Sequence, residues 1–115
     1  MKKTSASPSS WKREYARLRK SLASIGYLSQ GSVLDRATLR HPRSGYQWTR
    51  KVAGKTITVA LSPQQFRALS RAVENQRKLW KTISQMETLS RRILFADLPN
   101  PQRRKRLSRK VLGLI

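Results

Sequence analysis

The sequence predicts an α+β fold with a basic N-terminal helix, a β-hairpin over about residues 46–61, a long helix over about 63–97 and a basic tail. Three patterns support this prediction. Apolar residues recur every three or four positions near the N-terminus, and threonine alternates with aliphatic residues before residue 61. A helix-start signal then follows at Ser62.

The charge narrows the class of protein before any motif does. The 115 residues contain 26 Lys and Arg against five Asp and Glu, a formal net charge of +21 at pH 7. Such a charge destabilises a compact chain by self-repulsion, and a polyanion relieves it. Nucleic acid is therefore the expected partner. The length predicts one small domain over 10–98, between a flexible basic leader (1–9) and a basic C-terminal arm (99–115).

The composition leaves little for catalysis or cofactors. The absence of cysteine excludes disulfides and thiolate zinc sites, and His41 has no ligand partner at metal-binding spacing, so we expect no metal and no cofactor. No apolar run reaches the roughly 18 residues of a membrane span, and the N-terminus does not continue into an apolar signal core. We expect a cytoplasmic protein, associated with the nucleoid or with ribonucleoprotein.

The first helix is predicted to begin after Ser9 or Ser10, either of which can cap it, and to stop before Gly26. Its apolar stripe, which we interpret as core packing rather than membrane-surface binding, consists of Trp11, Tyr15, Leu18, Leu22 and Ile25. The other faces carry cations predicted to contact nucleic acid: Lys12, Arg13, Arg17, Arg19 and Lys20.

The segment from Gly31 to Arg43 gives a weak signal. Val33 and Leu34 fit a short strand, and a basic loop with turn residues follows. In this loop we expect Arg40 and Arg43 to contact phosphates.

The hairpin is better determined by its alternation. Trp48 is placed opposite Val59 and Tyr46 opposite Leu61, with Ile57 on the same apolar face, which a helix should cover. The opposite face then holds Gln47, Thr49, Lys51, Thr56, Thr58 and Ala60. This phase requires a loop with an even number of residues, either 53–54 or 52–55. Because alanine disfavours the positive φ of a tight turn, the four-residue loop stays open beside the two-residue one.

The tip of the hairpin is predicted to reach a phosphate backbone through Arg50, Lys51 and Lys55. The threonine face adds hydroxyl groups for phosphate or ribose. We interpret Tyr46 and Trp48 as core residues. The alternative is that both rings stack on unpaired bases, as in single-strand binders.

The long helix has the sharpest start signal. Ser62 fits the N-cap, Pro63 the first turn, and Gln65 closes a capping box. Its expected buried stripe consists of Phe66, Leu69, Val73, Trp80 and Ile83. Further along the helix, the stripe is widened by Leu79, Met86, Leu89, Ile93 and Leu94. No proline or glycine intervenes before Pro99, which predicts about 35 residues and a length of about 50 Å.

This stripe is longer than the first helix and the hairpin can cover. We therefore predict a homodimer through Leu79, Trp80, Ile83, Met86 and Ile93. The alternative is a break near Ser84 or Ser90 that folds the helix back on itself.

The tail after Leu98 has the highest density of charge. Its predicted phosphate-binding residues are Arg103, Arg104, Lys105, Arg106, Arg109 and Lys110. It is either a disordered basic arm or a segment that folds when its cations are neutralised, as a helix that Asn100 caps and Pro101 begins, with Leu107, Val111 and Leu114 on one face.

An enzyme is the less favoured interpretation. Tyr46 lies near Arg40, His41, Arg43 and Arg50, and such a set is known from enzymes in which tyrosine attacks a phosphodiester. No second arginine cluster or helical catalytic domain is present to hold such a site. The acids are too scattered for a two-metal nuclease site. We expect a protein without enzymatic activity.

The favoured function is binding of structured RNA within a ribonucleoprotein. The cations are spread along the whole sequence, and no helix-turn-helix pair is readable. The alternative is a DNA-binding accessory protein of a transposon or other mobile element. A lesser alternative is binding to an anionic membrane surface through the tail, which ends in the apolar segment 111–115.

Several short motifs are shared with a known group of proteins. They are Gly31-Ser32-Val33-Leu34, Ser44 to Val52, Gly54-Lys55-Thr56, and the long helix after Leu61. They resemble a family of short, uncharacterised bacterial proteins often found near transposases, with the pattern Gly-Ser-Leu, a cysteine-containing loop, His-Gly-Pro-Tyr, Thr-Arg-Lys and Gly-Lys-Thr.

The resemblance covers about 60% of the chain, and this sequence departs from the pattern in two ways. It has no cysteine, and Ser44-Gly45-Tyr46 stands where the family has His-Gly-Pro-Tyr. The resemblance implies a mobile-element context and assigns no catalytic residue.

Overall fold

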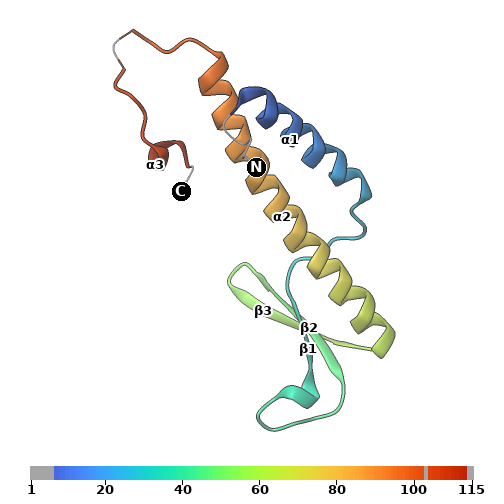
Figure 1. Ribbon diagram of the computed structural model, residues 1–115. Coiled ribbons are helices and arrows are strands. Elements are labelled where there is room, and N and C mark those ends of the chain that lie inside the picture. Colours follow the sequence, from blue (N-terminus) through green and yellow to red (C-terminus); the bar gives the residue numbers. More distant parts are fainter. Residues whose placement is uncertain (1–6, 103, 114–115) are drawn as a thin grey trace. The chain divides into compact units, whose positions relative to one another are not determined.

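The computed structural model describes residues 7–102 and 104–113 and confirms the predicted α+β fold (Figure 1). It contains a three-stranded antiparallel sheet, a long helix and shorter helices. The chain forms two compact units, one of Ile25–Leu79 and one of Met1–Ser24 with Trp80–Ile115. Within the predicted domain over 10–98, the chain passes from one unit to the other after Ser24 and returns after Leu79.

The sheet belongs to the unit 25–79 and has the strand order β1 (Ser32–Asp35), β2 (Tyr46–Val52) and β3 (Lys55–Leu61). The weak signal at Val33 and Leu34 corresponds to β1, in which Val33 is opposite Trp48. The predicted hairpin register is confirmed, since Trp48 is opposite Val59 and Tyr46 is opposite Leu61.

The hairpin turn is the shorter of the two predicted alternatives. Val52 pairs with Lys55, so the loop is the two residues Ala53 and Gly54, and the four-residue alternative is wrong. Both loop residues have positive φ, 51° for Ala53 and 80° for Gly54. Two-residue turns of this kind match the right-handed twist of paired strands, and this match offsets the unfavourable backbone of Ala53.

Helix α2 (Pro63–Asp97) has 35 residues and begins with the predicted capping box. The backbone N–H of Gln65 donates to Ser62 Oγ (3.1 Å), and the backbone N–H of Ser62 donates to Gln65 Oε1 (3.0 Å). The helix continues through Ser84 and Ser90, so the predicted alternative of a break is wrong. No helix-breaking residue occurs before Pro99.

The buried face of α2 changes along the helix. Ala72 and Val73 are buried in the unit 25–79, and Leu89 is buried in the other unit. Because Val73 and Leu89 are 16 positions apart, they lie on faces of α2 about 160° apart. Trp80, seven positions after Val73, lies within about 20° of the Val73 face but is 59% exposed, so a single continuous buried stripe is wrong for Trp80.

Helix α1 (Pro8–Ser21) begins earlier than predicted. Ser7 is the N-cap, and its Oγ accepts from the backbone N–H of Ser10 (3.1 Å). Ser9 and Ser10 are not caps. Pro8 has a φ suited to the first turn, so the helix begins closer to the N-terminus than predicted. The helix ends at Ser21, before a 3₁₀ turn over Leu22–Ser24 (η1).

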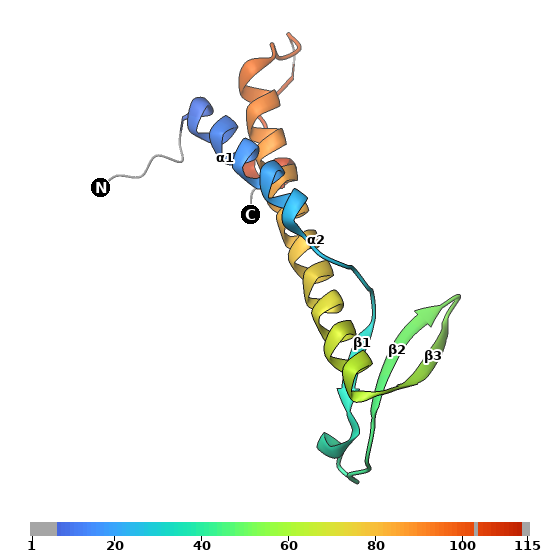
Figure 2. The same cartoon turned by 90° about the vertical axis from the view of Figure 1, so that its right-hand side faces the viewer.

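Helix α1 runs antiparallel to the C-terminal half of α2 within one unit (Figures 1 and 2). Lys12 Nζ lies 2.8 Å from Asp97 Oδ2, near the end of α2. Further along α1, Leu18 is buried and shares a pocket lining with Leu89. The apolar stripe of α1 therefore does contact the core.

The tail contains one helical turn, α3 (Arg109–Leu112), capped by Ser108. The helix that the tail is predicted to form when its cations are neutralised stays a prediction, and in this structure no helix begins at Pro101. The reason is local, since Ser108 Oγ accepts from the backbone N–H of Val111 (3.2 Å) and so provides a cap at a later position. Leu114 and most of the predicted leader lie outside the described residues, while Pro8 and Ser9 belong to α1.

Candidate nucleic-acid interface

Most of the positive charge has no acidic counterpart in the chain. The 26 Lys and Arg face five acids, so at least 21 of them cannot be neutralised by a carboxylate side chain. Among residues 7–102 and 104–113, three ion pairs form: Lys12–Asp97, Arg17–Glu14 and Arg77–Glu74. All six side chains are partly or largely exposed, and such pairs contribute little to stability.

The cations of α1 lie mainly on its outer side. Arg13, Arg17 and Lys20 recur at i, i+4 and i+7 and are exposed, on the side of α1 away from buried Leu18. Two hydrogen bonds join the Arg17 guanidinium to Glu14, which lowers the pKa of the Glu14 carboxyl and raises the pKa of Arg17. Lys12 and Arg19 are also exposed.

The hairpin tip divides its cations between two faces. By the strand register, Arg50 and Lys55 share a face with Ile57, and Lys51 lies on the threonine face opposite Thr56. The guanidinium carbon of Arg50 is 5.6 Å from the centre of the Trp48 ring. The three cations therefore surround the Ala53–Gly54 turn from both sides.

The apolar face of the hairpin is covered only near α2. The Tyr46 ring stacks on Phe66 of α2, with ring centres 4.3 Å apart. Ile57 and Val59 are 39% and 41% exposed, so the prediction that a helix covers the whole face is wrong for these two residues. The reason is the direction of the hairpin, whose turn end points away from α2 (Figure 2).

The two aromatic rings proposed for base stacking both have partners within the chain. Trp48 Nε1 donates to the backbone carbonyl of Gln30 (2.9 Å), and Tyr46 is stacked on Phe66. Gly31 makes this arrangement possible, because it has a φ of 102° and a Cβ there would lie 2.6 Å from Trp48 Nε1. Stacking of Tyr46 or Trp48 on bases stays a prediction.

The loop between β1 and β2 carries exposed Arg40, His41 and Arg43. Arg36 holds this loop in place: its backbone N–H donates to Gly45 O (2.9 Å), and its Nε donates to Gln47 Oε1 (3.1 Å). The loop lies at one end of β2 and the hairpin tip at the other, about 20 Å apart at 3.3 Å per residue. The structure therefore does not bring these two groups of cations together.

Helix α2 adds cations that were not predicted as site residues. Arg67, Arg71 and Lys78 are exposed and recur at i, i+4 and i+11, which places them on one face of the helix. Their spacing was readable in the sequence, between the apolar positions.

A nearby aromatic residue was also missed. Tyr27 is 91% exposed, and its backbone carbonyl accepts from Asn75 Nδ2 of α2 (3.0 Å). It lies in a segment without periodicity, so no sequence pattern indicated it.

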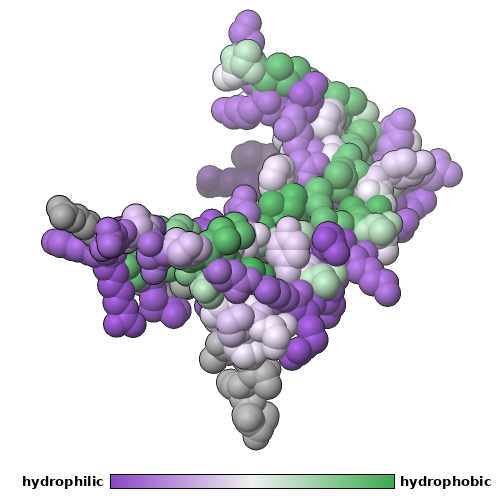
Figure 3. Space-filling view, turned by 90° about the horizontal axis from the view of Figure 1, so that it is seen from above, coloured by the Kyte–Doolittle hydropathy of each residue, from purple (hydrophilic) through white to green (hydrophobic). Residues whose placement is uncertain are grey.

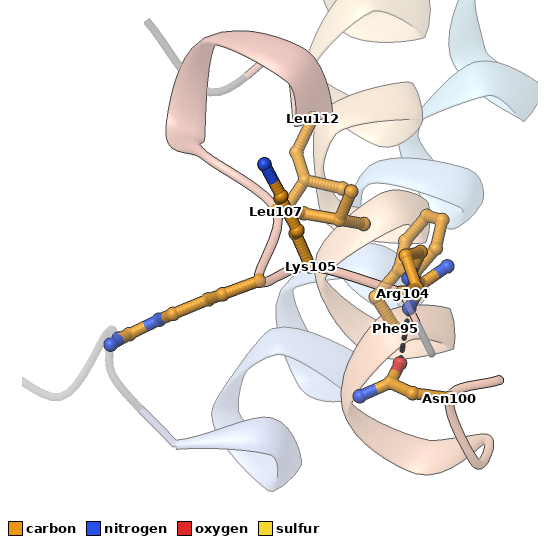
Figure 4. Close-up of a pocket in the computed structure, with 7 residues that line it drawn as sticks. Phe95, Asn100, Arg104, Lys105, Leu107 and Leu112 are labelled. Carbon is orange, nitrogen blue, oxygen red and sulfur yellow. Dashed lines mark hydrogen bonds between the residues drawn. The ribbon is translucent and has the colours of Figure 1, made fainter. Parts of the chain in front are cut away.

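The tail forms a shallow pocket of about 390 Å³ with the end of α2 (Figure 4). Arg104 hydrogen-bonds to Asn100 and lies over the Phe95 ring, with its guanidinium carbon 5.4 Å from the ring centre. Leu107 and Leu112 line the same pocket. The exposed cations of the described tail are Arg104, Lys105, Arg106, Arg109 and Lys110, while Arg103 lies outside the described residues.

The residues predicted to form a dimer do not share one exposed surface. Trp80 is largely exposed, whereas Leu79, Ile83, Met86 and Ile93 are half-buried. Ile93 lines a pocket together with Tyr15 of α1. The homodimer stays a prediction.

Hydrophilic side chains cover much of the face seen in Figure 3, with hydrophobic patches between them. Within the described part of the chain, no three His, Cys, Asp or Glu side chains gather in a group that could hold a metal ion. None of the helices described there is long and apolar enough to cross a membrane.

No protein-family model, curated protein or solved structure matches this chain. The resemblance to short proteins of mobile elements therefore stays a prediction.

Proposed function

We propose that this chain is a nucleic-acid-binding protein without enzymatic activity, and that structured RNA within a ribonucleoprotein is its preferred partner. One observation carries the proposal: the chain has 21 more Lys and Arg than Asp and Glu, and many of these cations are exposed in both units. Phosphates would neutralise this charge and release counterions, which drives binding. The protein would act in the cytoplasm, with ribonucleoprotein or the nucleoid.

The preference for RNA is supported by the distribution of the cations. They lie on α1, on the β1–β2 loop, at the hairpin tip, on α2 and along the tail. DNA readers of the helix-turn-helix type instead concentrate their contacts on one recognition helix. Folded RNA presents phosphates and ribose hydroxyls in many directions, which suits a spread of contacts.

A second candidate, a DNA-binding accessory protein of a mobile element, is favoured by the shape of the hairpin. The strands β2 and β3 form a two-stranded ribbon whose threonine face is exposed at Lys51, Thr56 and Thr58. The major groove of B-DNA admits a two-stranded β-ribbon, whereas side chains cannot read the deep major groove of A-form RNA. The resemblance to proteins of mobile elements supports the same candidate.

The contacts of Tyr46 support a role in packing over a role as a nucleophile. Its ring stacks on Phe66, and Arg50 lies four residues further along β2 and over Trp48. Membrane-surface binding is the weakest candidate. Val111 is 70% exposed, but a single exposed apolar residue in the described tail provides little area for insertion into lipid.

Competition binding tests the choice of polymer. A labelled RNA stem-loop bound to the full chain is displaced by unlabelled stem-loop or by a DNA duplex of equal length, at one salt concentration. We expect the RNA to compete better. Equal or better competition by duplex DNA would favour the second candidate, and absence of binding to both polymers at low ionic strength would contradict the proposal.

A tail variant tests the electrostatic mechanism. The quadruple change Lys105→Gln, Arg106→Gln, Arg109→Gln and Lys110→Gln removes four charges from exposed positions. On duplex DNA, the slope of log K against log salt should become less steep by about 3.6, at about 0.9 per phosphate contact.

The matched control for the tail keeps the charge and exchanges the residues, with Lys105→Arg, Arg106→Lys, Arg109→Lys and Lys110→Arg. Its slope should equal that of the wild type. An unchanged slope in the glutamine variant would show that the tail does not contact phosphate.

A further inference from the structure

Tyr27 is an aromatic residue with no role in the core. It lies between the 3₁₀ turn η1 and strand β1, in the unit 25–79, and its side chain is 91% exposed. Burial of an aromatic side chain is strongly favourable, so a protein with so small a core gains nothing in stability from this exposure. An exposed ring of this kind is instead available to a ligand.

The backbone that carries Tyr27 is held against α2. Asn75 Nδ2 donates to the carbonyl of Tyr27 (3.0 Å), and the backbone N–H of Ser29 donates to the carbonyl of Ala72 (3.2 Å). The backbone of Gly26 also lies close to Asn75, since a Cβ at position 26 would be 3.2 Å from Asn75 Nδ2. In Figure 2 the segment that leads into β1 runs alongside α2. The ring is therefore presented from a fixed support.

Cations flank the point of attachment. On the surface of α2, Asn75 has Arg71 at i−4 and Lys78 at i+3, and both are exposed. Residues at these spacings are neighbours on a helix surface, about 5–6 Å apart at Cβ. Arg67 extends the same basic face by one further turn. The backbone that carries the exposed ring of Tyr27 is thus held beside a helix face with a row of exposed cations.

We propose that Tyr27 is a stacking platform for an unpaired base, and that Arg71 and Lys78 neutralise the phosphates on either side of that base. This inference rests on the proposed function and deepens it, since it names single-stranded segments and loops as the ligand. Unpaired bases expose their ring faces and stack on aromatic side chains, whereas bases within a duplex are already stacked on one another.

The test compares two probes and three proteins. The probes are oligouridine, which is single-stranded, and a blunt RNA duplex; the proteins are the wild type, Tyr27→Ala and Tyr27→Phe, each as the full chain. Loss of the ring should weaken binding to oligouridine by about 5- to 150-fold, which corresponds to about 1–3 kcal/mol per stacked base. Binding to the duplex should not change, and Tyr27→Phe should bind oligouridine like the wild type.

Arg71→Ala serves as the electrostatic comparison, because a phosphate contact acts on both probes and its loss should weaken both. Ultraviolet cross-linking to an oligouridine that contains 5-iodouridine gives an independent readout, with the cross-link expected on the peptide that contains Tyr27. Because the side chain is exposed, Tyr27→Ala should keep the circular dichroism spectrum of the wild type.

Failure of the platform and failure of the proposed function give different results. If the wild type binds both probes and Tyr27→Ala binds oligouridine equally well, the platform is wrong and nucleic-acid binding stands. Wild-type binding to the duplex alone also overturns the platform. Absence of binding to either probe overturns both proposals.

Discussion

The two compact units carry their excess charge in different ways. The unit 25–79 has ten Lys and Arg against two acids, and the unit of residues 1–24 and 80–115 has sixteen against three. In the first unit, cations lie on a sheet, on a loop that Arg36 holds and on a capped helix. In the second, six cations fall between 103 and 110, where the described residues contain only the start of α3.

Under the proposed function, this difference predicts different roles for the two units in binding nucleic acid. A cation whose backbone position is fixed can select the phosphates it contacts and so set the register of the complex. A dense run of cations on a segment with little regular structure increases the affinity but does not determine which phosphates are contacted. We therefore expect the unit 25–79 to determine where the protein binds, and the tail to determine how tightly it binds.

The largest expected effect comes from Gly31→Ala, which disrupts the unit 25–79. The new Cβ would lie 2.4 Å from the carbonyl oxygen of Thr49 and 2.6 Å from Trp48 Nε1, at a φ of 102°. We expect a loss of about 3 kcal/mol in the free energy of unfolding of this unit. Hydrogen exchange should show loss of amide protection in β1 to β3, with protection kept in α1.

Gly54→Ala is the matched control for Gly31→Ala. Gly54 also has a positive φ, of 80°, but no atom lies within 4 Å of the position of its Cβ. Only the backbone penalty applies, about 1–2 kcal/mol. If both variants lose the same stability, close packing around Trp48 is not what holds this unit together.

The elements that the sequence predicted correctly depend on local chemistry. The capping box needs only Ser62 and Gln65, three positions apart, and both of its hydrogen bonds form. The hairpin register follows from an alternation that fixes which residues share a face, and Trp48 is opposite Val59 as expected. In both cases the interacting residues are close in the sequence, so no knowledge of distant contacts was required.

The incorrect predictions depend on contacts between distant residues or on a balance of small energies. Trp80 fits an apolar stripe, but α2 turns one face to its partners near Val73 and another near Leu89. The positive φ of Ala53 is unfavourable alone and is offset by strand pairing up to Val52 and Lys55. A periodicity cannot show either effect.

The candidate site divides in the same way. The cations of the tail, the hairpin tip and α1 were identified from the sequence, since charge density is visible without a structure. Tyr27 was not, because its significance lies in a hydrogen bond to Asn75, 48 positions away.

The second largest effect should come from Leu89→Ala, which tests the other unit. Leu89 is buried, and it lines a pocket together with Leu18 of α1. Removal of a buried leucine side chain typically costs about 2–5 kcal/mol. We expect a value near the lower end, since this core is small, with loss of amide protection in α1 and protection kept in the strands.

Leu94→Ala is the matched control in the same helix. Leu94 is 53% exposed, so the same change should cost much less stability than Leu89→Ala. Loss of protection in the strands after Leu89→Ala would contradict the independence of the two units. The comparison between the charges of the two units would then have no structural basis.

The smallest effect should be a gain in stability from Ala53→Asn. Ala53 has a φ of 51° in a two-residue turn with Gly54, and Asn-Gly is the favoured pair for such turns because asparagine tolerates the left-handed region. We expect a gain of about 0.5–1 kcal/mol, measured as a higher midpoint of thermal unfolding for the unit 25–79. Ala53→Val should have the opposite effect, since a β-branched residue is strained at positive φ. If Ala53→Asn tightens the hairpin, it should also fix Arg50, Lys51 and Lys55 more firmly, and duplex DNA binding through the ribbon should increase while binding through the tail does not.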